Sequence, residues 1–386
     1  MIQQHKYSAL FRAKKESDAR ETNPATCCHL LRMTLIDTFH RWTGGVVGLL
    51  LAILGLSGAI LVHKDAWVTL PHATDAQIQG TAHLAQFTQQ IMEDPATRPE
   101  SILFATKDFG LDRLSYKGGA GAYVDQNGGP VMRWTNQWER PEIWLFDFHH
   151  HLFAGDKGEV IIGVAAICGL FFVVTGVLLW LRTRKTFSFR LWPARMSRPA
   201  IMRHHRDLGI VIAPLLVLSL VTGAVLVFRP MAALLFGPGA PAQIDRSLAE
   251  PPPRTGKIAE RLNWSAMIEM GRHRFPEAEV RSLTLPRRGN GLITLRMRNP
   301  EEWLPNGRTT LWFAADSGAL VATRDAKNLP PAARGYNLLY PLHAAKVGGF
   351  LYRFVMTLSG LSLALLGSFA VWVFWFRRLA SARNSG

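Results

Sequence analysis

The chain has 386 residues, 48% of them hydrophobic, and its formal net charge is +16 at pH 7. It has no G-x-G-x-x-G after a predicted strand, no P-loop and no H-E-x-x-H, which excludes the common dinucleotide, nucleoside-triphosphate and zinc-protease motifs. The positive charge alone does not indicate nucleic-acid binding, because dense groups of basic residues lie in short segments that flank apolar runs.

The apolar residues are concentrated in four blocks. About 20 helical residues cross a hydrocarbon core about 30 Å thick, so each block predicts a transmembrane helix in a lipid bilayer. The blocks are residues 44–62, 160–181, 208–228 and 354–376. The first block does not resemble a cleaved signal peptide, because LVHKDAW after it lacks a small-x-small cleavage site.

These blocks divide the chain into nine parts, and they predict a membrane α-helical bundle with two small α+β domains. In chain order the parts are a basic N-terminal segment (1–35), helix 1 (36–64), a first domain (65–148), helix 2 (149–182), a basic loop (183–203), helix 3 (204–229), a second domain (230–342), helix 4 (343–377) and a tail (378–386).

Lys and Arg are dense in the N-terminal segment, in the loop and in the tail. Four spans place these three parts on the same side, which the positive-inside rule makes cytoplasmic. Both termini are therefore expected in the cytoplasm and the two long domains outside it. Long translocated domains are largely exempt from the rule, so the basic character of the second domain is no objection.

Both domains contain helix and strand patterns. Residues 102–116, 122–134, 280–297 and 309–323 have the residue types and turn signals of strands, and AQIQGTAHLAQFTQQIMED and IAERLNWSAMIEMGRHRF have helix-compatible patterns. Residues 237–256 are Pro-rich and predict an extended linker.

The chain also contains an internal two-fold repeat. HRWTGGVVGLLLAILGLSG begins at His40, HRDLGIVIAPLLVLSLVTG begins at His205, and each reaches a Ser/Thr-Gly pair 17 and 18 residues after its histidine. Each copy leads into one domain and returns through a histidine, His149 or His343, which precedes a glycine by six residues.

These four histidines predict two haem sites. The repeat places His40 and His205 near the cytoplasmic helix ends, and His149 and His343 near the outer ends, about 20 residues or roughly 30 Å away along the helices. Two neutral imidazoles fill both axial positions of a haem iron, which suits one-electron transfer. The chain lacks C-x-x-C-H, so both haems would be non-covalent haem b. The alternative is that interfacial histidines snorkel or bond a carbonyl.

Other side chains compete for the same roles. His204 is an alternative to His205, and His150, His151 or His63 could replace or supplement His149. Arg41 and Arg206 directly follow two candidate ligands and could pair with haem propionates, or could be ordinary positive-inside charge.

No catalytic residue is identifiable, and a substrate surface has only weak candidates. Trp134, Trp138, Trp303 and Trp312 lie in the outside domains, where tryptophan is either part of a core or part of a binding surface. Because the chain has no nucleotide-binding motif, its electrons would come from a membrane quinol or a cytoplasmic reductase.

Four segments together resemble the PepSY-associated transmembrane proteins of bacterial inner membranes. They are HRWTGGVVGLLLAILGLSGAIL, FHHHLFAGDKGEVIIGV with TGVLLW, HRDLGI with TGAVLVF, and LHAAKVGGFLYRFV. The resemblance covers all four predicted spans, and PepSY-like segments fill most of the rest.

The resemblance implies two PepSY-like periplasmic domains and a haem-containing oxidoreductase that reduces ferric siderophores and releases iron as Fe(II). It points to His40, His205, His149 and His343 as the ligands. Two other functions stay open: a haem conduit to another periplasmic acceptor, and a non-enzymatic PepSY sensor, binding protein or siderophore-uptake accessory.

Overall fold

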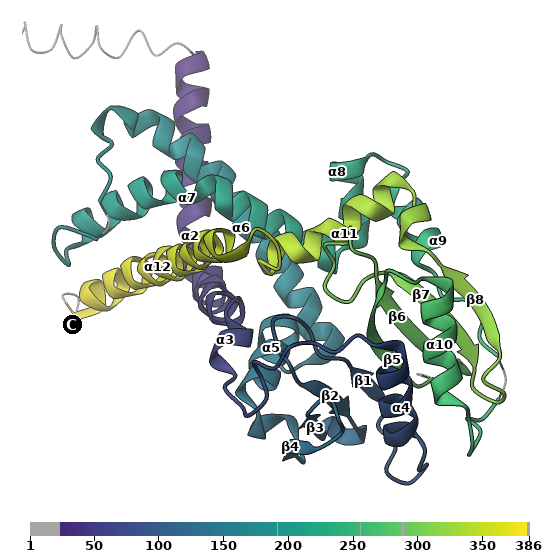
Figure 1. Cartoon of the computed structure of the whole chain (residues 1–386). Helices are drawn as coiled ribbons and strands as arrows, with labels where there is room; N and C mark the ends of the chain where they lie inside the picture. The colour runs from purple at the N-terminus through teal and green to yellow at the C-terminus, as the bar shows by residue number, and fades with distance from the viewer. Residues whose placement is uncertain (1–23, 191, 255, 287–289, 384–386) are drawn as a thin grey trace, which may run out of the picture. The chain divides into compact units, whose positions relative to one another are not determined.

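The computed structural model describes residues 24–190, 192–254, 256–286 and 290–383 (Figure 1). Most of the predicted N-terminal segment, and the last three residues of the predicted tail, therefore lie outside the described residues. The chain divides into two compact units, Met1–Ala52 with Cys168–Ala213 and Leu365–Gly386, and Ile53–Ile167 with Pro214–Ala364.

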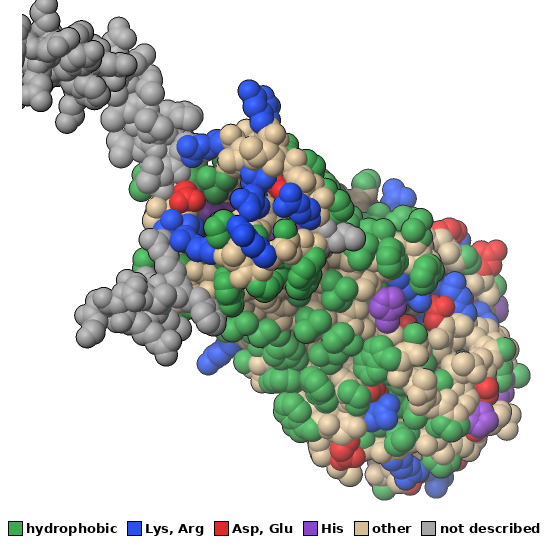
Figure 2. All heavy atoms as spheres, turned by 90° about the vertical axis from the view of Figure 1, so that its left-hand side faces the viewer, with side chains coloured by type: hydrophobic (Ala, Val, Ile, Leu, Met, Phe, Trp, Pro, Cys, Tyr) green, Lys and Arg blue, Asp and Glu red, His purple; other side chains and the backbone are tan. Residues whose placement is uncertain are grey.

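Four helices are long and apolar enough to cross a membrane, as predicted. They are α2 (Pro24–Leu61), α6 (Gly155–Thr183), α7 (Arg198–Val227) and α12 (Gly349–Arg383). Many of their hydrophobic side chains are exposed, among them Val46, Val164 and Leu358. Figure 2 shows hydrophobic side chains covering much of one face of the protein, with Lys and Arg gathered on one part of it.

Helices 2 and 4 do not begin at the returning histidines, which corrects the predicted boundaries of 149 and 343. His149 lies on a separate helix, α5 (Pro141–His151), and His343 is the last residue of α11 (Pro331–His343). Each short helix is followed by a break before the long helix begins.

Left-handed backbone conformations produce these two breaks. Leu152 (φ 48°) and Phe153 (φ 59°) have left-handed conformations after α5. Ala345 (φ 50°) has one after α11. Gly155 (φ 55°) and Gly349 (φ 60°), the glycines six residues after each histidine, then begin the long helices. A left-handed residue ends an α-helix, and glycine adopts this conformation without a Cβ penalty.

The predicted strands form one antiparallel sheet of eight strands in the order β4-β3-β2-β1-β5-β6-β7-β8. The strands are β1 (Ser101–Leu103), β2 (Asp112–Ser115), β3 (Gly121–Val124), β4 (Pro130–Trp134), β5 (Glu279–Thr284), β6 (Leu292–Arg298), β7 (Thr309–Ala314) and β8 (Leu320–Arg324). The sequence predicted two domains, but β1 pairs with β5 and joins both sets of strands. This pairing covers two edges that would otherwise be open.

Two amphipathic helices pack on this sheet and on each other. They are α4 (Thr81–Met92) and α10 (Trp264–Arg274), both within segments with a predicted helical pattern. Phe87 of α4, Ile268 of α10 and Ile102 of β1 belong to one buried apolar cluster that also includes residues of β2, β3, β5, β6 and β7. Burial of this cluster holds the two halves together.

The prediction of an extended linker over 237–256 is wrong for residues 240–248. These residues form α9 (Ala240–Leu248), with a proline in its first turn. Ala240 and Ile244 lie one turn apart and are buried against α11 residues such as Ala333. That shared apolar contact stabilises a helix that the proline content of the segment concealed.

The remaining elements are short. They are the helices α3 (Lys64–Trp67) and α8 (Ala233–Phe236), and the 3-10 helices η1 (Lys117–Gly119), η2 (Gln137–Glu139), η3 (Arg184–Thr186), η4 (Arg229–Ala232) and η5 (Ala326–Asn328).

Candidate functional site

The structure brings His149 and His343 together, and we call them the outer pair. Their ring centres are 6.3 Å apart. The Nδ1 atom of His149 lies 2.8 Å from the Oγ atom of Ser57 on α2. The Nδ1 atom of His343 lies 3.1 Å from the Oγ1 atom of Thr222 on α7. Each ring is thus fixed by a hydroxyl of the Ser/Thr-Gly pair that marks the sequence repeat.

The hydroxyl geometry selects one imidazole tautomer. Ser57 donates its hydroxyl hydrogen to the carbonyl of Leu54 (3.1 Å), and Thr222 donates to the carbonyl of Leu218 (2.6 Å). A hydroxyl has only one hydrogen, so each oxygen accepts a hydrogen bond from the Nδ1–H of its histidine. The Nε2 atoms then carry the free lone pairs, which is the state of a metal-ligating histidine oriented by a neighbouring acceptor.

Glycines make room for both outer rings. A Cβ atom on Gly58 would lie 3.1 Å from Cε1 of His149, and one on Gly223 would lie 3.2 Å from Cε1 of His343. These distances are tighter than ordinary van der Waals contact, so a larger residue at either position would displace the imidazole.

His40 and His205 form the inner pair, with ring centres 6.4 Å apart. The Nδ1 atom of His40 lies 2.7 Å from the Oγ1 atom of Thr175, which donates to the carbonyl of Phe171 at 2.7 Å. His40 therefore has the same tautomer as the outer histidines. The Nδ1 atom of His205 is buried and has no hydrogen-bond partner among the described residues.

Both pairs fit a metal held between two imidazoles. With a metal–nitrogen bond of about 2.0 Å and about 1.1 Å from that nitrogen to the ring centre, two opposed imidazoles have centres about 6.2 Å apart. The observed separations of 6.3 and 6.4 Å are within about 0.2 Å of this value. A pair supplies only two ligands, so the remaining positions of a haem iron would be filled by the porphyrin.

Burial keeps the outer histidines neutral. It lowers the pKa of His149 to about 3, with a further decrease from the neighbouring His343 and His150, and it also lowers the pKa of His343. An imidazole must be unprotonated to bind a metal, so this environment favours ligation.

The alternative histidines have other contacts. His150 stacks on Phe146 at 4.1 Å and His151 bonds Asp147 at 3.1 Å. His63 lies 2.8 Å from the hydroxyl oxygen of Thr357. The ring of His204 lies 5.7 Å from the ring of Phe369, measured between ring centres. The structure therefore pairs the histidines that the repeat favoured.

The two arginines proposed for propionates are engaged with nearby protein groups. Arg41 lies 3.5 Å from Asp37, one turn away on the same helix. Arg206 pairs with Asp207 at 2.7 Å and donates to the carbonyl and hydroxyl oxygens of Thr186, both at 2.8 Å.

Two of the four candidate tryptophans belong to the core, which is one of the two roles that the sequence left open for them. Trp134 and Trp312 are 5% and 3% exposed because they pack within the sheet domain. Trp138 and Trp303 are exposed.

Sequence reasoning missed Thr175, although its signal was present. Thr175–Gly176 is another Ser/Thr-Gly pair within a predicted span, and a Cβ atom on Gly176 would lie 3.7 Å from Cε1 of His40. Its position in helix 2, outside the recognised repeat, concealed its similarity to Ser57–Gly58 and Thr222–Gly223.

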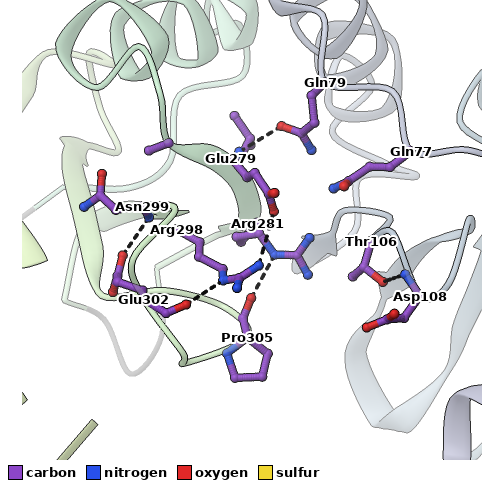
Figure 3. A network of polar contacts seen from close by, with 12 residues as sticks. Gln77, Gln79, Thr106, Asp108, Glu279, Arg281, Arg298, Asn299, Glu302 and Pro305 are labelled. Atoms are coloured by element: carbon purple, nitrogen blue, oxygen red, sulfur yellow. Dashed lines mark hydrogen bonds and ion pairs between the residues drawn. The ribbon is translucent and has the colours of Figure 1, made fainter. Parts of the chain in front are cut away.

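A buried polar network joins the two halves of the sheet (Figure 3). Arg281 on β5 is 3% exposed and donates to the carbonyls of Ala105 (3.0 Å) and Pro305 (3.1 Å), one from each half. Asp112 is also 3% exposed and accepts a hydrogen bond from the backbone N–H of Ala105 at 2.7 Å. Both side chains satisfy backbone groups, which indicates a structural role.

Asp112 predicts a pH-dependent stability of the sheet. Burial raises its pKa from 3.8 to about 7, so the folded state holds this proton more tightly than the unfolded state. Stability from this group should be greatest below pH about 4 and fall by up to about 4 kcal/mol as pH rises to about 7. Asp112→Asn should flatten this dependence, measured as unfolding of the full chain followed by fluorescence of the buried tryptophans. Equal pH dependence in both proteins would contradict the prediction.

Comparison with known proteins relates the chain to a family and to a protein of a named organism. The family model of the PepSY-associated TM region matches residues 38–378. The uncharacterized protein PA4219 of Pseudomonas aeruginosa is 27% identical over 257 residues. That match covers 62% of this chain and 64% of the relative, so it spans less than two thirds of the relative's length.

Proposed function

The chain belongs to the PepSY-associated transmembrane family, and from that premise we propose that it is a di-haem b oxidoreductase of the bacterial inner membrane. It passes electrons across the membrane to a ferric siderophore in the periplasm, from which iron leaves as Fe(II). Both termini are cytoplasmic, and the sheet domain, made of two PepSY-like halves, is periplasmic. The internal repeat relates these halves.

One observation carries the proposal: two histidine pairs have the ring separation of bis-histidine metal ligation. The separations are 6.3 Å for the outer pair and 6.4 Å for the inner pair. Bound haem supplies a one-electron redox centre at each pair. The protein holds, orients and buries it.

The surrounding side chains prepare three of the four histidines for this role. Ser57, Thr222 and Thr175 accept from the Nδ1–H groups and fix the ring orientations. Gly58 and Gly223 give the outer rings the space to lie against α2 and α7. Similar hydroxyl–glycine contacts in both halves also support the proposed repeat.

One-electron transfer is suited to the release of iron from a ferric siderophore. Its oxygen donors bind the hard Fe(III) ion far more tightly than the less charged Fe(II) ion. One electron reduces Fe(III) to Fe(II), and the intact chelator then holds the metal weakly. The electron comes from a membrane quinol or from a cytoplasmic reductase.

Mixing the reduced full-length protein with a ferric siderophore tests this activity. We expect haem oxidation and the appearance of about two Fe(II) per chain, trapped by an Fe(II)-specific chelator, because each reduced haem holds one electron. Ferric citrate and an oxidised periplasmic redox protein serve as competing acceptors. Haem that stays reduced with the siderophore but is oxidised by another acceptor would contradict the proposed substrate and leave the electron conduit in place.

A further inference from the structure

A group of four basic side chains lies near the outer pair, and we call it the basic cluster: Lys64, Arg113, Lys346 and Arg353. They come from four different elements, namely α3, β2, the break after α11, and the first turns of α12. Lys64 is within electrostatic range of Arg113 and Lys346, and Arg353 is within range of Asp65, which pairs with Lys346.

Acidic side chains only partly neutralise this cluster. Lys346 pairs with Asp65 at 2.7 Å, whereas Arg353 lies 3.9 Å from Asp108. The nearby Glu142 is already paired with Arg140 at 2.7 Å. In the part of the chain that the structure describes, Lys64 and Arg113 have neither a side-chain hydrogen bond nor an ion pair.

Two nitrogen atoms of this half-buried cluster are buried without a partner, which is the observation that points to a ligand. The Nε atoms of Arg113 and Arg353 are inaccessible to solvent and have no hydrogen-bond partner among the described residues. Burial also lowers the pKa of Lys64, against the opposing effect of Asp65. A buried N–H group of a cation is unfavourable without an acceptor, so an anion is the expected partner.

Several links connect the basic cluster to the outer pair. Lys346 follows His343 by three residues, and Tyr340, one turn before His343, is within electrostatic range of Asp65. Lys64 follows Gly58, which contacts His149, by six residues, and is within range of Glu142 on the helix that carries His149.

We propose that the basic cluster binds the propionate carboxylates of the haem held by the outer pair. Arginine and lysine form their strongest hydrogen bonds with such ionised oxygens. This role differs from that of Arg41 and Arg206, which the sequence suggested and which lie beside the inner pair. The inference rests on the proposed function, because it requires haem between His149 and His343.

The test compares haem with haem dimethyl ester, whose propionates are esterified and uncharged. Both are titrated into the full-length apoprotein in a His205→Ala background, which leaves only the outer pair intact. We expect the parent to bind haem at least about tenfold more tightly than the ester, since several charge-assisted hydrogen bonds are lost.

Lys64→Gln with Arg113→Gln should reduce this preference to about equal binding. Two exposed residues of the same domain give the matched control, Lys107→Gln with Arg133→Gln, which removes the same charge and should keep the preference. Lys64→Arg keeps the charge and should also keep the preference for haem over the ester. This variant shows whether a change at position 64 by itself disturbs folding.

Three results would overturn the inference. Equal binding of haem and ester by the parent would mean that the carboxylates have no charged partner. An undiminished preference in the double variant would place their partner elsewhere. A parent that binds neither compound would overturn the proposed function together with the inference, whereas the first two results leave the haem site intact.

Discussion

Replacing His149 by alanine should halve the low-spin haem content, from about two haems per chain to about one. Its ring faces His343 across 6.3 Å, and Ser57 orients it so that Nε2 has the free lone pair. Alanine removes this ligand, and the other histidines on α5 are held by Phe146 and Asp147. His343→Ala should have the same effect on the same haem.

The neighbouring histidine provides a matched control. His150→Ala removes an imidazole from the same helix, one residue away, and should leave about two haems per chain. The measurement is a pyridine haemochrome assay together with the optical spectrum of each purified variant. Loss of haem in His150→Ala and retention in His149→Ala would contradict the assignment of the outer ligands.

Replacing His205 by alanine should remove the inner haem and leave the outer one. His205 lies 6.4 Å from His40. Without His205, a haem iron at the inner pair would keep His40 and lack its second histidine ligand. The low-spin haem content should again fall from about two to about one per chain.

Two further variants make this second prediction specific. His204→Leu replaces the adjacent histidine by an apolar side chain at a position that is 3% exposed, and it should keep both haems. His149→Ala combined with His205→Ala should lose nearly all low-spin haem, because the two pairs share no residue. A double variant that keeps one haem would show that a pair is wrongly assigned.

The sequence predicted the elements whose signals are local. Uncharged apolar runs of sufficient length identified all four long helices, and β-branched and aromatic runs between glycine turns identified the regions of all eight strands. The Ser/Thr-Gly pairs and the glycines six residues after His149 and His343 were also visible. These glycines mark positive-φ positions where the helices break.

The remaining features depend on contacts between distant residues. Pairing of β1 with β5, which fuses two predicted domains into one sheet, joins Ile102 to Leu283, and these residues are 181 positions apart in the sequence. Helix α9 depends on burial of Ile244 against α11. Proline content and short-range periodicity carry no information about either contact.

The same limit applies to the candidate site. Sequence spacing favoured His149 over His150 and His151, but only the α5 geometry shows which ring faces His343. The hydroxyl partners and the basic cluster also come from elements that are distant in the sequence. Arg113 and Lys346, for example, are separated by more than 200 residues.

A reduced-minus-oxidised visible spectrum of the purified full-length protein, with pyridine haemochrome quantitation, tests the central claim most directly. Our account predicts about two low-spin b haems per chain. A folded preparation from haem-sufficient cells that contains no haem, and takes up none when haem is added, would contradict it.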